Sequence, residues 1–164
     1  SISRIRKFRN MTLRREWLNA LELSFNETLE IYIKLTEEQG NLKYEQNKWS
    51  LKELIEHLTD CEKTFNYRAL HFSKNDSTEL PGFDENLFVE NGNAKNQPLK
   101  LLIEEYKLTR LSSIYFFGKL SNDELSRKGI SNENEISVTQ IAEHIAKHNQ
   151  HHLKIIKERY LPLL

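Results

Sequence analysis

The chain has 164 residues, a length typical of a single domain with a substantial core, so one domain over residues 1–164 is expected. Its formal net charge is +0 with 29% charged residues, so no overall field would attract nucleic acid or an anionic membrane. Cys61 is the single cysteine, which excludes an internal disulfide framework and favours the reducing cytoplasm, and no apolar run approaches the roughly 20 residues of a membrane span.

The first predicted elements are a flexible arm and an amphipathic helix. Residues 1–10 are basic, and we expect them to form a solvated arm. Apolar residues at helical spacing then predict a helix that begins in the teens and extends to Thr36, before Gly40 and Asn41. Ser50 and Glu53 have the spacing of a capping box, which predicts a second helix that reaches about Ser73.

The connection that follows, residues 74–97, contains no helical stripe. A connection this long is uncommon within a compact domain and usually has a functional or topological reason. If the second and third helices run parallel, the chain must return along the bundle between them, which requires such a length. The sequence therefore predicts a crossover, after which Pro98 opens a third helix that extends to Gly118.

The last part of the chain predicts a fourth long helix. Ser121 begins one short capped turn, and a polar link follows as far as Glu135. Ser137 and Gln140 form another capping box, which starts a helix that ends at Pro162 at the latest. Four long helices and no strand-like alternation predict an all-α fold, a four-helix bundle with a long crossover between helices two and three.

Four histidines occur in the fourth helix, within the segment IAEHIAKHNQHHLKII. His148 and His152 continue an apolar seam whose steps of three and four residues place them on its inward face. Buried imidazoles need partners, and two histidines at positions i and i+4 have the spacing of metal-binding helices. With His57 from the second helix they would form a three-histidine site with one open position, typical of catalytic zinc. The alternative is a histidine cluster without a metal.

Three segments, NKWSLKELIEHLTDCEKTFNYRA, LPGFDENLFVENG and IAEHIAKHNQHHLKII, resemble the DinB-like (DinB/YfiT) superfamily in their order and spacing. The resemblance implies the same bundle with its crossover. It also implies a divalent metal held by one histidine of the second helix and an H-x-x-x-H pair of the fourth, which correspond to His57, His148 and His152. Zinc or nickel is the expected ion, with manganese or iron as alternatives.

The resemblance also implies an activity and partners. Characterised members of the DinB-like superfamily include transferases of low-molecular-weight thiols such as bacillithiol or mycothiol, and metal-dependent hydrolases. We therefore expect transfer of a small thiol or hydrolysis of a small substrate, in a cytoplasmic homodimer without nucleic-acid or membrane partners. The alternative is a non-enzymatic, stress-related bundle that binds a metal or a partner without catalysis.

Other polar and aromatic residues have more than one interpretation. Asp60 could orient a metal-binding imidazole, or it could be solvated or paired with Arg68. His151 is expected at the rim with His144, where it could contact a substrate. Cys61 is one turn after His57 and could reach a metal, but it is interpreted as a core cysteine. Trp49 and the other aromatic residues of the helices could form a substrate cage, but they are interpreted as packing residues.

Overall fold

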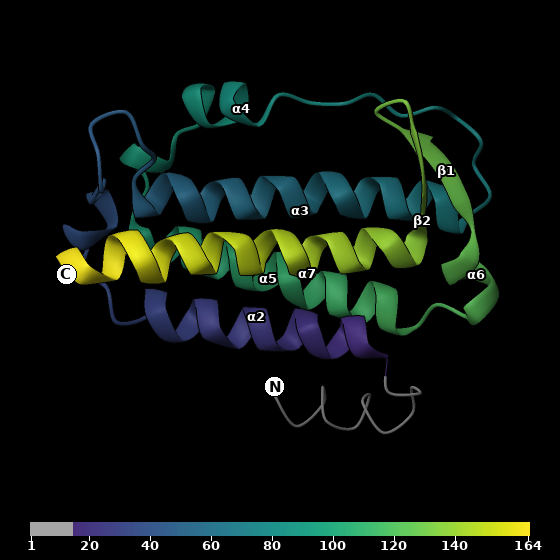
Figure 1. The fold of residues 1–164 in the computed structure, drawn as a ribbon, viewed down its shortest axis with the longest axis horizontal. Helices are drawn as coiled ribbons and strands as arrows, with labels where there is room; N and C mark the ends of the chain where they lie inside the picture. Colours follow the sequence, from purple (N-terminus) through teal and green to yellow (C-terminus); the bar gives the residue numbers. More distant parts are fainter. Residues whose placement is uncertain (1–14) are drawn as a thin grey trace.

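The computed structural model describes residues 15–164, in which four long helices lie side by side (Figure 1). They are α2 (Glu16–Tyr32), α3 (Leu51–Ser73), α5 (Leu99–Gly118) and α7 (Val138–Ile155). Figure 1 shows α3 and α5 running in one direction and α2 and α7 in the other. Side-chain hydrogen bonds from Lys63 to Glu105 and from Asn66 to Ser113 join α3 to α5. The residue numbers of the partners increase together on the two helices, as they do when two helices run parallel. The predicted bundle with parallel second and third helices is confirmed.

The crossover between α3 and α5 returns along the outside of α3 (Figure 1). It contains two short elements that the sequence analysis did not predict, α4 (Glu85–Asn91) and the 3-10 turn η2 (Ala94–Asn96). Asp84 caps α4, because its carboxylate accepts hydrogen bonds from the backbone N–H groups of Asn86 and Leu87. A helix of two turns is too short for a recognisable apolar stripe, which explains why the sequence pattern did not reveal it.

The expectation of no strands was wrong at one end of the bundle. After the short helix α6 (Asn122–Ser126), the strands β1 (Lys128–Ser131) and β2 (Asn134–Ser137) form an antiparallel hairpin. Its two turn residues, Asn132 and Glu133, both have positive φ, as a two-residue hairpin turn of the primed type requires. Strands of four residues are too short to show clear alternation. Leu80 of the crossover forms a bridge to Ser131, which attaches the crossover to this hairpin.

Most predicted helix ends agree with the structure. The capping boxes at Ser50, Ser121 and Ser137 are all formed. The first long helix ends at Tyr32 rather than Thr36, and the 3-10 turn η1 (Gln39–Asn41) follows it. The chain continues past α7 through a π-helical turn, η3 (Ile156–Tyr160), and a 3-10 turn, η4 (Leu161–Leu163). The predicted basic arm lies outside the described residues. Within residues 15–164 no helix is both long and apolar enough to cross a membrane.

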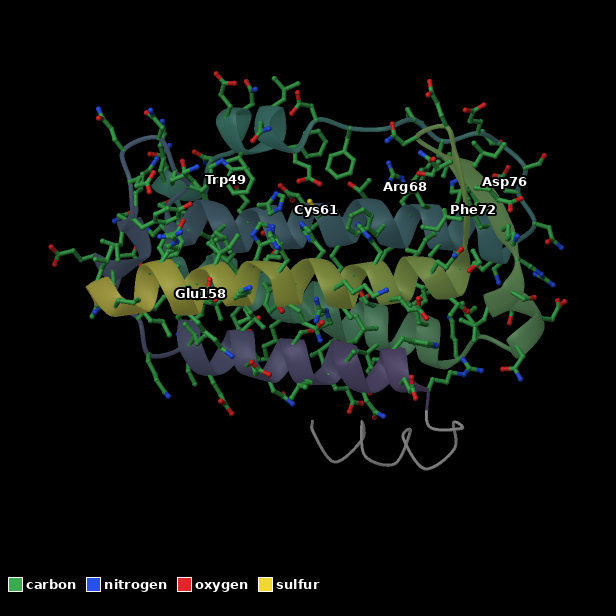
Figure 2. All side chains as sticks on the ribbon, in the orientation of Figure 1. Trp49, Cys61, Arg68, Phe72, Asp76 and Glu158 are labelled. Carbon is green, nitrogen blue, oxygen red and sulfur yellow. The ribbon has the colours of Figure 1, made fainter. Side chains whose placement is uncertain are left out.

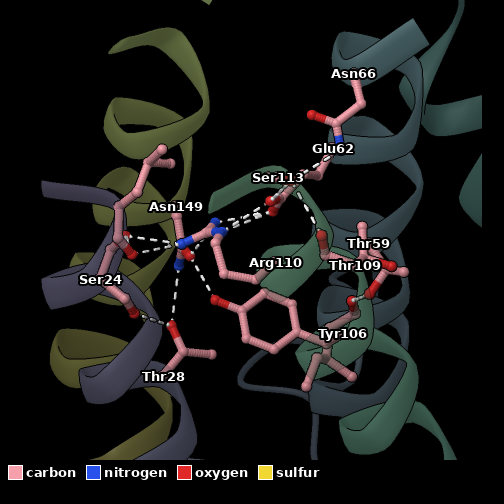
Figure 3. A network of polar contacts seen from close by, with 12 residues as sticks. Ser24, Thr28, Thr59, Glu62, Asn66, Tyr106, Thr109, Arg110, Ser113 and Asn149 are labelled. Atoms are coloured by element: carbon pink, nitrogen blue, oxygen red, sulfur yellow. Dashed lines mark hydrogen bonds and ion pairs between the residues drawn. The ribbon is translucent and has the colours of Figure 1, made fainter. Parts of the chain in front are cut away.

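The interior of the bundle consists of two apolar clusters with a polar layer between them. One cluster surrounds Leu21 and Phe117, and the other surrounds Tyr32 and Ile55. The polar layer is a hydrogen-bonded network that draws on all four long helices (Figure 3): Ser24, Thr28, Glu62, Tyr106, Arg110, Ser113 and Asn149. Because its polar groups are paired inside the core, this layer restricts how the four helices can be aligned along the bundle.

Candidate metal centre

Three histidines predicted from the sequence meet at the contact between α3 and α7. Nε2 of His57 lies 3.1 Å from Nε2 of His148 and 3.1 Å from Nε2 of His152. The last two Nε2 atoms are 3.2 Å apart. Their helices bring them together because His57 lies on the face of α3 that packs on α7, and the other two are one turn apart on α7.

The side chain of Asn149, next to His148 and before His152, fixes this part of α7. It is buried, and its Oδ1 accepts hydrogen bonds from the Tyr106 hydroxyl at 2.6 Å and from Arg110 at 2.9 Å. Its Nδ2 donates to Thr28 Oγ1 at 3.0 Å. Asn149 thus anchors α7 to both α2 and α5 at the turn that carries His148 and His152. The polar layer and the three histidines occupy the same level of the bundle.

The environment keeps the three rings neutral. His57 is 2% exposed and His152 is 8% exposed. Burial lowers the pKa of His57 to about 4. Burial, and then the neighbouring imidazoles, lower the pKa values of His148 and His152 to about 3. Neutral imidazole is the form of histidine that binds a metal, so the three rings are available as ligands at neutral pH.

The spacing of the nitrogens also suits a metal ion. Zinc to nitrogen distances of about 2.0–2.1 Å place the nitrogens of a tetrahedral site roughly 3.4 Å apart, close to the 3.1–3.2 Å separations here. Three neutral rings that point their Nε2 atoms at one another cannot all donate a hydrogen bond to one another in good geometry. A shared cation would satisfy all three lone pairs. The residues therefore fit a divalent ion, with the three Nε2 atoms as its ligands.

Two further groups lie close to the histidines, a carboxylate and a thiol, and the carboxylate was not expected there. Glu85 of α4 places Oε2 at 3.9 Å from Nε2 of His57. Cys61 is buried, with Sγ at 3.6 Å and 3.8 Å from the two ring nitrogens of His57. One potential ligand atom each from Glu85, Cys61, His57 and His148 all lie within 4.8 Å of one another. Glu85 lies in the segment LPGFDENLFVENG, which contributed to the family resemblance, but no helical spacing pointed to it as a ligand because the connection showed no helical pattern.

Trp49 lies at this site, although packing was its expected role. Its ring centroid is 4.6 Å from that of His57 and 6.3 Å from that of His152. Figure 2 shows Trp49, Cys61 and Arg68 in this order along the side of the bundle that faces the crossover. Trp49 and His152 line a cavity of about 250 Å³, together with Tyr44, Asn47, Lys48, Leu54, Asn86, Ile155 and Tyr160. This volume is below the usual range for drug-sized ligands, so the cavity suits a small molecule.

The remaining predicted residues occupy different surroundings. The carboxylate of Asp60 pairs with Lys63 at 3.5 Å, rather than with a histidine ring or Arg68. His151 is exposed, with its ring 5.2 Å from that of His152. His144 stacks on His148 with ring centroids 6.2 Å apart. His71 lies far along α3, where Nδ1 contacts Asp76 at 2.5 Å.

The structure is thus an all-α four-helix bundle with a crossover between its parallel second and third helices, and it carries a candidate metal site in the histidine cluster at the α3–α7 contact. A sequence model of the DinB superfamily matches residues 20–156, most of the chain. The chain belongs to the DinB superfamily.

One known protein and one solved structure are similar to the chain. The chain is 24% identical over 143 residues to a protein of Oceanobacillus iheyensis that bears the name "Putative metal-dependent hydrolase OB0413". The match covers 87% of this chain and 82% of that protein. The fold is similar to that of YfiT from Bacillus subtilis, described as a probable metal-dependent hydrolase with an unusual four-helix-bundle topology. The TM-score is 0.77 with 16% sequence identity, over 90% of this chain and 86% of that one.

Proposed function

We propose that the protein is a metal-dependent hydrolase of small substrates, in which His57, His148 and His152 hold the ion. The observation that carries the proposal is the convergence of three neutral, mostly buried imidazoles, with Nε2 atoms 3.1–3.2 Å apart. A divalent ion at such a site polarises a substrate carbonyl or phosphoryl oxygen and makes a nucleophile available at neutral pH. The name of the Oceanobacillus relative supports hydrolysis as the reaction.

The residues of this chain would bind and orient the substrate. Trp49 offers an aromatic face next to His57, and the cavity of about 250 Å³ beside it suits a small molecule. Lys48, Asn47 and Asn86 line the same cavity and supply one cation and two amides. These groups suit a small polar substrate that carries an oxygen acceptor or an anionic group.

The second candidate reaction is transfer of a low-molecular-weight thiol to an electrophile. The same site would serve it, because a divalent ion holds a bound thiol in its deprotonated form. The characterised thiol transferases of the superfamily support this candidate. Zinc or nickel is the expected ion for either reaction, and the single cysteine is in keeping with a reducing cytoplasm.

The metal content of purified variants tests the site. Alanine at His57, His148 or His152 leaves two imidazoles, so each variant should lose most of its metal while wild type retains about one ion per chain. His71→Ala is the control, because its ring pairs with Asp76 elsewhere on α3. His144 is a poorer control, since its ring stacks on His148. Equal metal content in His71→Ala and His148→Ala would contradict the proposal.

The metal-loaded protein should then be assayed with ester, amide and phosphate substrates, and separately with a thiol and an electrophile. Metal-dependent turnover in the first series supports hydrolysis, and turnover only with thiol supports the second candidate. A loaded protein that is inactive in both series would favour the non-enzymatic alternative.

We also propose a homodimer through the outer face of α5. The exposed apolar residues Leu101, Leu108 and Tyr115 recur every seventh position along this helix, so they form one stripe along it. A second copy would cover this stripe, which polar substitution should disrupt. We expect a dimer in sedimentation at micromolar concentration and a monomer for Leu108→Glu. A wild-type monomer under these conditions would contradict the proposal.

A further inference from the structure

The crossover carries a carboxylate to the edge of the histidine cluster. Glu85 is the first residue of α4, and its Oε2 lies 3.9 Å from Nε2 of His57. In the described part of the chain, His57 is the only basic residue within ion-pair distance of this carboxylate. The side chain is 45% exposed, so it could have turned to solvent. Instead it lies beside the imidazoles of His57 and His148, which carry no charge of their own.

Contacts on both sides of Glu85 hold it in this place. Upstream, Phe83 packs edge-on against Phe65 of α3, with ring centroids 6.3 Å apart. Downstream, the backbone N–H of Ala94 donates to Glu56 Oε2 at 3.3 Å. A Cβ at Gly92 would come within 2.4 Å of the same oxygen, so the backbone approaches Glu56 as closely as glycine permits. The two ends of α4 are thus attached to α3.

The charge of a bound divalent ion would favour an anionic ligand such as this carboxylate. Three neutral imidazoles leave both positive charges of a divalent ion uncompensated in a mostly buried site, which is unfavourable in a medium of low dielectric constant. A carboxylate oxygen is an established ligand for zinc and for the harder divalent ions. Oε2 of Glu85 lies 3.9 Å from Nε2 of His57, whereas the Nε2 atoms of the histidines lie 3.1–3.2 Å apart. Rotation about the side-chain bonds of Glu85 is enough to close this difference.

We propose that Glu85 is a fourth protein ligand of the metal, delivered by the crossover. This inference rests on the proposed metal site and adds to it an anionic ligand from outside the four long helices. A divalent ion that accepts five ligands would still keep one position for water or substrate, as the proposed hydrolysis requires. It also gives the crossover a role beyond topology, since an ion bound by α3, α7 and Glu85 would fasten α4 to the bundle. Metal binding should therefore order the backbone around residues 85–92.

Metal affinity measured on three proteins tests the assignment. Zn²⁺ is titrated into metal-free wild type, Glu85→Gln and Glu90→Gln in competition with a chelator. Glu85→Gln removes the charge with little change of shape, and Glu90→Gln removes the same charge from an exposed position on the same helix. We expect Glu85→Gln to bind at least about tenfold more weakly than wild type, and Glu90→Gln to stay within about twofold.

The same titrations at high salt distinguish direct binding of Glu85 to the metal from long-range electrostatic attraction. The loss in Glu85→Gln should persist at 0.5 M salt if the carboxylate is a ligand, whereas the effect of a charge that does not touch the metal should be largely screened. Hydrogen exchange provides a second measurement: Zn²⁺ should slow exchange at residues 85–92 in wild type and Glu90→Gln, but not in Glu85→Gln.

The outcomes also separate this inference from the proposed site. If wild type binds Zn²⁺ tightly and Glu85→Gln binds equally well, or if its loss disappears at high salt, Glu85 is not a ligand and the three-histidine site stands. If wild type does not bind Zn²⁺ at all, the proposed metal site itself is refuted.

Discussion

Arg110 Nε lies 2.8 Å from Oε1 of Glu62 in the centre of the bundle, where the two side chains are 1% and 2% exposed. The guanidinium also donates to Ser24 and Asn149, and Ser113 donates to Glu62 at 2.5 Å (Figure 3). A buried charge pair of this kind is costly to form, yet it is much more costly to break on one side only.

Replacement of Glu62 by alanine should therefore destabilise the protein strongly. The change leaves a charged guanidinium in the core without its counter-ion, and we expect a loss of about 3–5 kcal/mol in the free energy of unfolding. Urea denaturation followed by circular dichroism would measure it. Glu105→Ala is the control, because its pair with Lys63 is about half exposed and should contribute less than about 1 kcal/mol. Similar losses in the two variants would show that the core pair has no special role.

Trp49 should report metal binding through its fluorescence. Its ring centroid lies 4.6 Å from that of His57, whereas Trp17 packs on Phe117 in the apolar cluster around Leu21 and Phe117. Nickel or cobalt at the three histidines should therefore quench the emission of Trp49 much more than that of Trp17. We expect the quenching to disappear in Trp49→Phe and to remain in Trp17→Phe. Quenching that survives in Trp49→Phe would place the ion elsewhere.

Cys61 should be unreactive in the folded protein and dispensable for metal binding. Burial raises the pKa of its thiol well above the usual range, with further contributions from the carboxylates of Glu85 and Asp60. Reaction with an aromatic disulfide reagent should be slow in buffer and fast in urea. Cys61→Ala should keep the metal affinity within a few-fold of wild type. A strong sulfur-to-cobalt charge-transfer band in the cobalt form, absent from Cys61→Ala, would instead identify the thiolate as a ligand.

Asp76 should make stability depend on pH in the acid range. Hydrogen bonds from Thr78, and then the contact with His71, lower the pKa of its carboxyl to about 2. Because the folded pKa lies below the unfolded value of about 3.9, the stabilisation is present above that value and is lost as the pH falls toward 2. Asp76→Asn should therefore be less stable than wild type at pH 6 by urea denaturation, and this difference should shrink as the pH is lowered toward 2. A difference that is independent of pH would exclude this linkage.

The sequence by itself determined the positions of the long helices. Ser50 and Ser137 indicated helix starts because a capping box is local. In it the serine side chain accepts from the backbone N–H three residues on, and the side chain of that residue accepts from the serine N–H. The length of the connection after Ser73 predicted parallel helices, because a chain of known reach must span a bundle of known length. The i, i+4 spacing placed His148 and His152 on one face for the same local reason.

Only the tertiary structure decided what these helices bring together. The distance between His57 and the α7 pair depends on how α3 packs on α7, which the paired side chains of Arg110, Glu62 and Asn149 help to fix. Glu85 and Trp49 reach the cluster from segments without a helical pattern, so no periodicity pointed to them. The hairpin after α6 was missed because short strands take their stability from pairing, as with Leu80 and Ser131, rather than from the composition of one segment. Spacing along the chain is a local property, whereas the convergence of side chains depends on packing among elements far apart in sequence.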